Sequence, residues 1–301
     1  MPIFLGIDGG GTKTSCLAGD EQAVLGSGTG AGSNLVRVSE PYARESLAAA
    51  IRQACVVANV APAQVTRTCV GMAGAARPEI NRAVRRILAE FIPGEIQIVG
   101  DMVIALEAAF GAGAGVVVIA GTGSIAYGRN SAGQTARAGG WGPAISDEGS
   151  GHWIGRSAVA AVMRAHDEGE RTTLLECIQK TWGVSTHDQV VLAANAHPAP
   201  NFSELAPVVL SAADAGDTLA TAVLTQAGAE LAALGDIVVR RLFQDAAAVP
   251  VAMSGGVFRN NALVRQVFYN NLRSRRPQAS LNTTVIESVR GALEMARRGS
   301  N

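Results

Sequence analysis

Residues 4–14 combine an acidic residue, three glycines and two threonines in a spacing that could bind a nucleotide. The order is Phe-Leu-Gly-Ile-Asp-Gly-Gly-Gly-Thr-Lys-Thr, with the carboxylate at Asp8. Glycines let the backbone approach a ligand closely, and turn amides and hydroxyls are donors for phosphate oxygens. Asp8 would repel bare phosphate, so it indicates a divalent cation, held directly or through water. An ordinary glycine-rich hairpin would show the same pattern.

Two common phosphate-binding patterns do not fit this segment. A P-loop has lysine directly after its last glycine, whereas Thr12 stands before Lys13. The dinucleotide spacing G-x-G-x-x-G does not match Gly9–Gly11 either. Apolar runs precede and follow the glycines, so we expect a strand, a tight turn and a returning strand.

The opening pattern returns near the middle of the chain. Apolar residues 116–120 lead into Gly121-Thr122-Gly123-Ser124, and another short apolar run follows. This echo suggests a duplicated fold with two glycine-rich hairpins. Two such sets of donors could grip a polyphosphate chain from opposite sides.

Two polar residues stand at the ends of other predicted segments. Asp101 follows a short buried strand at 96–99 and precedes a helix at 102–110. A carboxylate there could act as a general base, although aspartate is also a common helix N-cap. Asn34 ends a Gly/Ser-rich stretch at 26–34, which could be a flexible linker. Alternatively, its amide could read the hydroxyl groups of a ligand.

Two further glycine-rich segments could contact ligands. Residues 138–151 are too rich in Gly and Pro for regular structure, and they offer an apolar plate at Trp141 with acceptors at Asp147 and Glu148. Sugar sites combine such features, but a solvent-exposed acidic turn would too. Between a strand at 249–253 and a helix near 262–272, a pair of glycines would place backbone amides at a ligand.

Composition sets the broad class of the protein. The 301 residues suggest about two domains, and 48% hydrophobic residues suffice for a core. A formal net charge of zero argues against a nucleic-acid partner. The four cysteines match no metal pattern, which favours reduced thiols in a cytoplasmic protein. Neither a signal peptide nor a membrane-spanning segment is expected.

The predicted elements alternate between strands and helices, as in an α/β fold with mixed sheets. A strand and a loose loop are expected over 16–30, and a flexible hinge over 112–115. The other predicted segments are helices over 39–58, 78–91, 152–166, 170–181, 203–215 and 217–243, strands over 65–71 and 281–286, and a terminal helix over 288–297.

Taken in order, these motifs resemble those of the N-acetylglucosamine kinase group within the BadF/BadG/BcrA/BcrD-type ATPases, of the actin/Hsp70/sugar-kinase superfamily. The resemblance runs over essentially the whole chain. It implies two ribonuclease-H-like lobes with a cleft between them, an N-terminal lobe of residues 1–112 with helix 288–299 packed back on it, and a C-terminal lobe of residues 113–287. The motifs that carry it are Gly6–Thr12, Gly100-Asp101, Gly121–Ser124, Gly140–Gly142 with Asp147–Ser150, and Ser254–Phe258.

The resemblance also implies roles for individual residues. Asp101 matches the general base, and Asp8 would position Mg²⁺. ATP would contact Gly10, Gly11, Thr12, Lys13, Thr122, Gly123, Gly255, Gly256, Val257 and Phe258. The sugar would contact Asn34, Asp101, Ser124, Gly140, Trp141, Gly142, Asp147 and Glu148.

The function expected from the resemblance is ATP-dependent phosphorylation of an amino sugar, with N-acetylglucosamine and its 6-phosphate first. Kinases of glucosamine or N-acetylmuramic acid are alternatives, as are a non-kinase ATPase and a sugar-sensing regulator. The zinc motif of the ROK kinases and the paired cysteines of the dehydratase activators are absent from this chain. Relatives in the family are often dimers, so a homodimer is an expectation as well.

Overall fold

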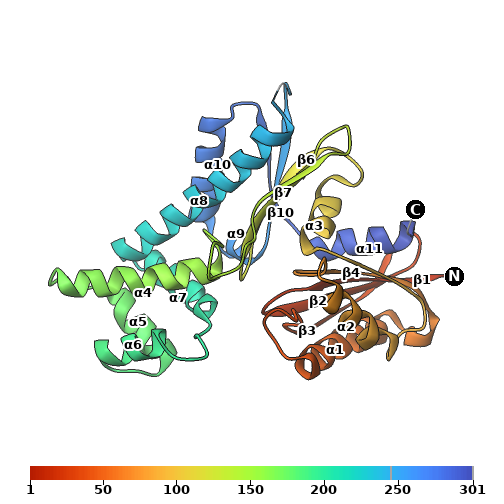
Figure 1. Cartoon of the computed structure of the whole chain (residues 1–301), viewed down its shortest axis with the longest axis horizontal. Coiled ribbons are helices and arrows are strands. Elements are labelled where there is room, and N and C mark those ends of the chain that lie inside the picture. The colour runs from red at the N-terminus through yellow and green to blue at the C-terminus, as the bar shows by residue number, and fades with distance from the viewer. Residues whose placement is uncertain (245, 300–301) are drawn as a thin grey trace. The chain divides into compact units, whose positions relative to one another are not determined.

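The computed structural model describes residues 1–244 and 246–299 and contains two compact α/β units. Unit 1 comprises Met1–Val117 and the C-terminal segment from Ile286, and unit 2 comprises Val118–Val285. Each unit is built around one five-stranded sheet (Figure 1).

The two sheets have the same strand order. Unit 1 has the order β3-β2-β1-β4-β5, and the second sheet has the order β8-β7-β6-β9-β10. In both sheets, the first three strands along the chain are neighbours, and the first of them lies at the centre. The last two strands, which follow after a helical insertion, lie on the other side of that central strand. This equivalence supports the duplication that the repeated glycine motif predicts. The strands are β1 (Ile3–Gly9), β2 (Lys13–Gly19), β3 (Val24–Ala31), β4 (Val65–Met72), β5 (Glu95–Val99), β6 (Gly115–Ala120), β7 (Ser124–Arg129), β8 (Thr135–Gly139), β9 (Val249–Ser254) and β10 (Ala279–Ile286).

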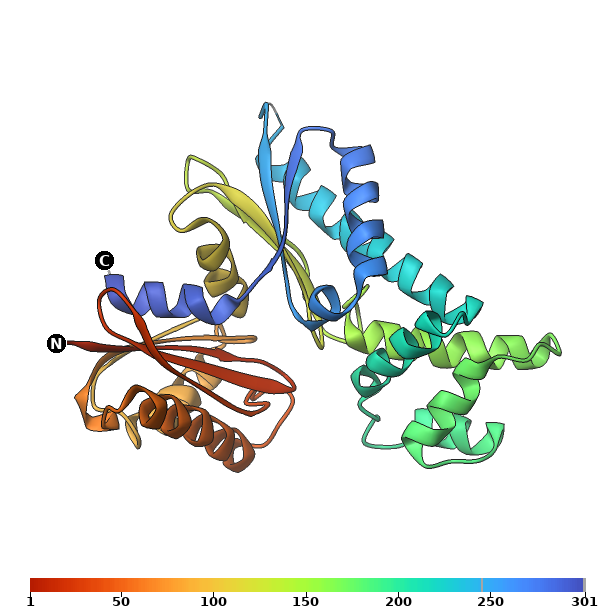
Figure 2. The ribbon, with the colours of Figure 1, turned by 180° about the vertical axis from the view of Figure 1, so that it is seen from behind.

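Helices cover both faces of the first sheet. One core cluster includes Leu47 and Val84 and lies under α1 and α2, and a second includes Ile104 and Leu293 and lies under α3 and α11. Figure 2 shows α1 on one face of this sheet and α11 on the other. Unit 1 contains α1 (Glu40–Ala58), a short 3-10 helix (Pro62–Gln64), α2 (Pro78–Ala89), α3 (Asp101–Phe110) and α11 (Ser288–Arg298).

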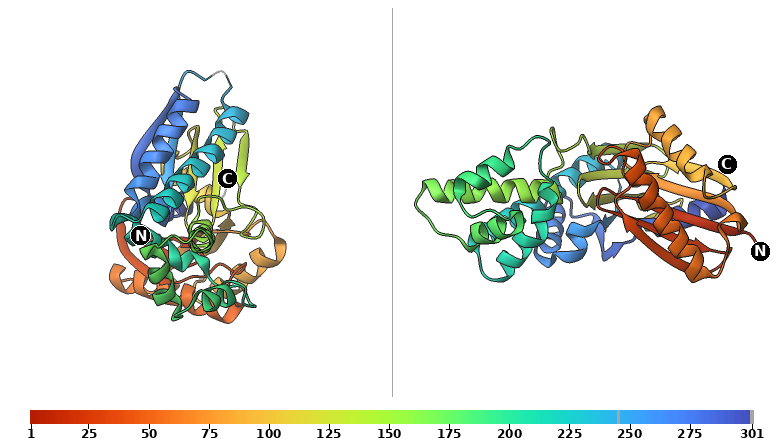
Figure 3. Two further views of the ribbon diagram at one scale, coloured as in Figure 1. Left: turned by 90° about the vertical axis from the view of Figure 1, so that its left-hand side faces the viewer. Right: turned by 90° about the horizontal axis from the view of Figure 1, so that it is seen from below.

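The loose loop predicted after the strand within residues 16–30 is wrong, because Val24–Ala31 forms the edge strand β3. Its glycines serve the packing of α1. A Cβ atom on Gly28 would lie 2.1 Å from the carbonyl oxygen of Ala50, and one on Gly30 would lie 2.2 Å from that of Ser46. Strand and helix therefore meet backbone to backbone, along the face where α1 crosses the sheet (right-hand view of Figure 3). The repeated glycines are typical of a flexible linker, and only the tertiary contact accounts for them.

Unit 2 carries a longer helical insertion between β8 and β9. Its central helix, α8, is long and apolar enough to cross a membrane, but 56% of its most apolar window is buried inside the unit, as in a core helix. The elements are α4 (Gly151–Asp167), α5 (Thr173–Trp182), α6 (His187–Ala194), a 3-10 helix (Phe202–Leu205), α7 (Ala206–Asp214), α8 (Thr218–Leu242), α9 (Gly256–Asn260) and α10 (Ala262–Arg275).

Two short elements of unit 2 differ from the sequence-based expectation. Regular structure was excluded from 138–151, yet Ala138 and Gly139 end the edge strand β8. Residues 256–260, expected as a loop, form the short helix α9. Both elements are five residues long, which leaves too few positions for a periodic pattern.

Asp217 joins the starts of two helices in the insertion. Its Oδ1 accepts from the amide of Ala220 at the start of α8 (2.9 Å), and its Oδ2 accepts from the amide of Leu174 at the start of α5 (3.0 Å) and from the hydroxyls of Thr172 and Thr173. Burial alone would raise the pKa of Asp217, but these hydrogen bonds outweigh it and lower the pKa.

The contact between β3 and α1 predicts that Gly28→Ala is destabilising. The added methyl group must displace the α1 backbone, which we expect to cost about 2 kcal/mol or more of unfolding free energy. The midpoint of thermal unfolding measures the effect. Ser27→Ala, on the exposed face of the same strand, is the matched control and should change stability by less than about 0.5 kcal/mol. Equal midpoints for the two variants would contradict the proposed packing.

Asp217→Asn should destabilise the protein in a pH-dependent way. Because the folded-state pKa of Asp217 is lowered, its carboxylate stabilises the fold above the ordinary aspartate pKa, and this contribution disappears as the pH falls through the lowered value. We expect a loss of about 1–2 kcal/mol at pH 7 that shrinks below about pH 4. Urea unfolding at pH 7, 5 and 3 tests this, with exposed Asp214→Asn as control. A difference that stays constant with pH would rule out the carboxylate as the cause.

Candidate active site

The β1–β2 turn of unit 1 is a tight hairpin that requires glycine. The amide of Gly10 donates to the carbonyl oxygen of Lys13 over 3.0 Å, and a Cβ atom on Gly10 would lie 2.8 Å from that oxygen. Gly11 is partly exposed, and Thr12 and Lys13 are exposed. The turn therefore presents backbone and hydroxyl donors to solvent at the end of β1, as a phosphate-binding hairpin needs.

A second segment supports the turn from behind. The amides of Ser33 and Asn34 both donate to the carbonyl oxygen of Gly10, at 3.1 and 3.3 Å. The buried hydroxyl of Thr14 donates to the carbonyl oxygen of Ala31 at 2.6 Å and lies within hydrogen-bond distance of Ser33 Oγ, at 2.8 Å. Asn34 is 6% exposed, and its Oδ1 accepts from the amide of Val36, so its side chain has a fixed orientation. Thr14 and Ser33 were not singled out from the sequence, where each is one small hydroxyl residue among many.

Asp8 and Asp101 lie at the same edge of the first sheet. In the parallel strands β1, β4 and β5, Asp8 pairs with Gly71, and Gly71 pairs with Val99. Two strand spacings place Asp8 about 10 Å from Val99, and Asp101 follows two residues later. The edge beyond the carboxyl ends of parallel strands is where α/β folds bind ligands.

Close packing fixes the start of α3, and with it Asp101. Ile104 fills the space beside Gly71, where a Cβ atom would lie 2.2 Å from its Cδ1. On the far side of α3, a Cβ atom on Gly291 would lie 2.0 Å from the carbonyl oxygen of Ile104. Asp101 is the first residue of α3 and follows the N-cap Gly100, so it is not the cap itself. Its Oδ1 accepts from the amide of Met102 over 3.0 Å.

The corresponding turn of unit 2 is attached to the start of α4. The amide of Gly121 donates to the carbonyl oxygen of Gly123 over 2.9 Å. The first two amides of α4, from Gly151 and His152, donate to the carbonyl oxygens of Gly121 and Thr122 at 2.8 and 3.2 Å. Helix α4 thus engages the carbonyl groups of Gly121 and Thr122 in this turn.

Asp147 meets this turn through its carboxylate. It is 3% exposed and has a left-handed backbone with φ of 74°, a conformation that costs free energy for a non-glycine residue and is enriched at functional sites. Its Oδ1 lies 3.4 Å from the amide of Ser124, and the Ser124 hydroxyl donates to the carbonyl oxygen of Glu148 at 2.7 Å. The structure therefore brings together three residues predicted to bind the sugar, from two separate motifs.

Trp141 stands out from a loop shaped by left-handed glycines. Gly140 and Gly142 have φ of 69° and 95°, which explains their residue type. The indole of Trp141 is 61% exposed. The guanidinium Cζ of Arg137 lies 4.0 Å from the centre of the indole ring. Sequence reasoning missed Arg137, because nothing in the spacing of the β8 residues indicates this stacking.

The segment after β9 has a different arrangement from the one expected. Gly255 has φ of 101°, and a Cβ atom there would lie 2.3 Å from the carbonyl oxygen of Ala120, so the segment packs against the end of β6. Beside Gly256 the space is open. Phe258, by contrast, is fully buried, with its ring centre 5.1 Å from that of Phe268. Its ring belongs to the core of unit 2, so any contact with a nucleotide would come from the neighbouring backbone.

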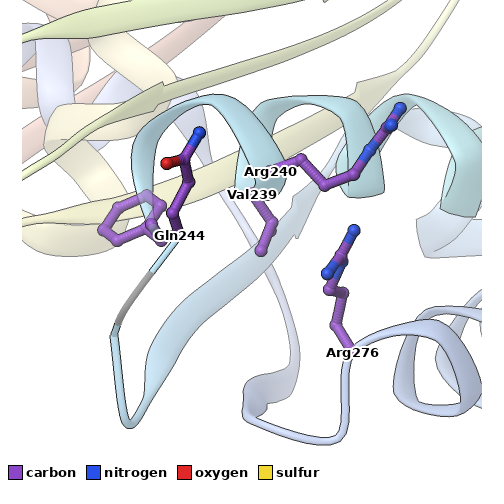
Figure 4. A pocket seen from close by; sticks show the side chains of 5 residues that line it. Val239, Arg240, Gln244 and Arg276 are labelled. Atoms are coloured by element: carbon purple, nitrogen blue, oxygen red, sulfur yellow. The ribbon is translucent and has the colours of Figure 1, made fainter.

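A separate hollow of about 380 Å³ lies at the far end of α8 (Figure 4). Arg240 and Arg276 line it together with Phe243, but both guanidinium groups already pair with Asp236, at 3.3 and 2.5 Å. None of the predicted site residues lines this hollow.

The donor set does not form a metal cage of protein groups. Within residues 1–244 and 246–299, no cluster of three or more His, Cys, Asp or Glu side chains could hold a metal ion. The four cysteines are free thiols, and Cys16, Cys55 and Cys69 are buried. Burial raises the pKa of the Cys69 thiol to about 12, so this thiol is protonated at neutral pH.

Comparison with known families agrees with this architecture. The profile of the BadF/BadG/BcrA/BcrD ATPase family matches residues 5–293. The chain belongs to this family. The resemblance inferred from the motifs is thereby confirmed, as is the actin-like α/β fold with a five-stranded mixed sheet in each unit.

Several members and neighbours of the BadF/BadG/BcrA/BcrD family carry sugar-kinase names. An N-acetylmuramic acid/N-acetylglucosamine kinase from Clostridium acetobutylicum is 31% identical, with 99% of each chain covered. An N-acetyl-D-glucosamine kinase from Dictyostelium discoideum is 30% identical, with 97% of each covered. A crystal structure from Chromobacterium violaceum, provisionally named an N-acetylglucosamine kinase, superposes with a TM-score of 0.77 at 26% identity, with 98% of each chain covered.

Proposed function

We propose that this protein is an ATP-dependent kinase that phosphorylates an amino sugar, with N-acetylglucosamine, at its 6-hydroxyl, as the first candidate. The observation that carries the proposal is the shared sheet edge of Asp8 and Asp101 beside the β1–β2 hairpin. A carboxylate for the cation, a carboxylate for the acceptor hydroxyl and a turn with donors for phosphate are all groups that phosphoryl transfer uses. The kinase names of the similar proteins support the reaction class.

In unit 1, the exposed turn residues Gly10 to Lys13 would bind phosphate oxygens of ATP. Mg²⁺ bound with ATP would neutralise phosphate charge, and Asp8 would hold it through water. The donor set suits this role, because Mg²⁺ keeps several waters and needs few protein ligands when phosphates are present. Asn34 has its Oδ1 engaged by Val36, so it would offer its NH₂ group to a sugar hydroxyl.

Asp101 would act as the general base. A sugar hydroxyl is a weak acid, so a carboxylate that accepts its proton while the oxygen bonds to the γ-phosphorus lowers the barrier. The oxygen–phosphorus bond to ADP breaks in the same displacement, and ADP leaves. The transition state is loose, so the rigid placement of α3 serves the geometry that the reaction requires.

In unit 2, the residues around Asp147 would bind the sugar and those of the β6–β7 turn the nucleotide. Thr122 and Gly123 would add donors for phosphate. Ser124, Glu148 and the loop around Trp141 would join Asp147 in contacting hydroxyl and acetyl groups. The backbone at residues 255–257 would face the adenosine.

Several alternatives from the sequence analysis stay open. Glucosamine and N-acetylmuramic acid remain alternative acceptors, since a glucosamine kinase from Vibrio cholerae is 28% identical over 77% of this chain. A cytoplasmic location and a homodimer stay predictions. An ATPase that acts without a sugar, and a sugar sensor without turnover, are the competing functions.

Release of ADP across a panel of amino sugars tests the reaction. We expect ADP release that depends on the sugar, with formation of a sugar phosphate of matching amount. Release that is independent of sugar would support the ATPase, and sugar binding without turnover would support the sensor.

Asp101→Asn tests the base. We expect kcat to fall by at least about 100-fold, because the amide cannot accept the proton, while the Kd values for ATP and sugar stay within a few-fold. Steady-state kinetics and calorimetric titration measure these quantities. Asp167→Asn removes the same charge at an exposed position in α4 and serves as the control. Wild-type turnover by Asp101→Asn would remove this residue from the mechanism.

A further inference from the structure

We propose that Arg137 and Trp141 form a subsite for a carboxylate on the hexosamine, so that the protein accepts an acidic amino sugar such as N-acetylmuramic acid. This inference rests on the proposed kinase function. N-Acetylmuramic acid carries a lactyl ether that ends in a carboxylate, whereas N-acetylglucosamine is neutral.

The guanidinium of Arg137 lies over the indole ring of Trp141, and Arg137 is partly exposed. The indole of Trp141 covers one face of the Arg137 guanidinium, with 4.0 Å between Cζ and the ring centre. Arginine binds carboxylates through the N–H groups in its plane, which point out from the edge and not from the face. The contact with the Trp141 indole therefore orients the Arg137 guanidinium without using its N–H donors.

Few protein groups compete for these donors. The Nη1 atom of Arg137 lies 3.5 Å from the carbonyl oxygen of Gly140, at the outer limit of a hydrogen bond. Among the residues that the structure describes, no carboxylate forms an ion pair with Arg137. The nearby loop contains Asp147, but its carboxylate faces Gly123 and the amide of Ser124.

The backbone that carries Arg137 is held in place. Its carbonyl oxygen accepts from Arg241 Nη1 of α8 over 2.9 Å, and its Cα pairs with that of Tyr127 in the neighbouring strand β7. The adjoining loop exposes apolar surface, with Trp141 at 61% and Ile145 at 77%. A fixed cation beside an open aromatic plate matches a sugar that has an apolar ring face and an acidic substituent.

The test compares two acceptors, and the measured quantity is their selectivity ratio. This ratio is kcat/KM for N-acetylmuramic acid divided by kcat/KM for N-acetylglucosamine. Arg137 also contacts Trp141, so Arg137→Gln can weaken the binding of both sugars, but an equal effect on both cancels in the ratio. We expect the ratio to fall at least tenfold in Arg137→Gln, through a higher KM for the acid, because the carboxylate lies away from the reacting hydroxyl. The ratio for Arg137→Lys should lie between those of the wild type and Arg137→Gln, since lysine keeps the positive charge but loses the two parallel N–H donors of the guanidinium.

Three controls separate the effect of charge from the effect of packing. Trp141→Leu should lower kcat/KM for both sugars by similar factors. With the methyl ester of N-acetylmuramic acid, which has the bulk without the charge, Arg137→Gln should leave the ester's ratio to N-acetylglucosamine within twofold of the wild type. Arg164→Gln, at an exposed position in α4, should leave every ratio unchanged.

The outcomes distinguish this inference from the function on which it rests. An unchanged ratio in Arg137→Gln, or wild-type turnover of N-acetylglucosamine without turnover of the acid, would overturn the carboxylate subsite and leave the kinase standing. If the wild type phosphorylates no hexosamine, both fail.

Discussion

Close contacts of glycine backbones with a neighbouring side chain or backbone determine where the candidate catalytic residues of unit 1 stand. Helix α3 lies against β4 because Gly71 leaves room for Ile104, and α11 lies against α3 because Gly291 does the same on the other side. A side chain at either position would overlap its neighbour and push α3 outward. The start of α3 would move with it, and Asp101 is its first residue. The position of Asp101 at the sheet edge thus depends on two glycines, Gly71 and Gly291, that are not among the predicted site residues.

Unit 2 relies on backbone conformation more than on helix packing. Gly140 and Gly142 have left-handed backbones, and Asp147 has one despite its side chain. Gly149 is required for a second reason, since a Cβ atom there would lie 2.5 Å from Leu231 Cγ. The loop can keep a strained conformation at Asp147 because α8 on one side and the β6–β7 turn on the other both hold it. A carboxylate that is aimed by its surroundings before a ligand arrives loses less entropy when it binds.

The features that could be predicted from the sequence are those that depend on local residue patterns and on the order of the motifs. The family, the α/β class, most helices and the duplicated strand plan are confirmed, because glycine turns and apolar periodicity are local properties. Strand β3 was missed because its glycines are characteristic of a linker when α1 is left out of view. The stacking of Arg137 on Trp141 was missed because it depends on how the loop folds back toward β8. The role of Asp217 was missed because it depends on the starts of α5 and α8 lying side by side, and these are far apart in the sequence.

The duplication gives two equivalent sheets, but the chemical groups on them differ. Asp8 stands one residue before the first glycine cluster, and the residue in that place before the second cluster is Ala120. In the binding mode proposed above, a second carboxylate there would place negative charge next to phosphate without a cation of its own, which would weaken nucleotide binding. Unit 2 instead places its acidic group, Asp147, behind Ser124 and Gly123. The same strand plan therefore places a carboxylate, Asp8, directly before the glycine turn in unit 1, and a buried carboxylate, Asp147, against the backbone of the corresponding turn in unit 2.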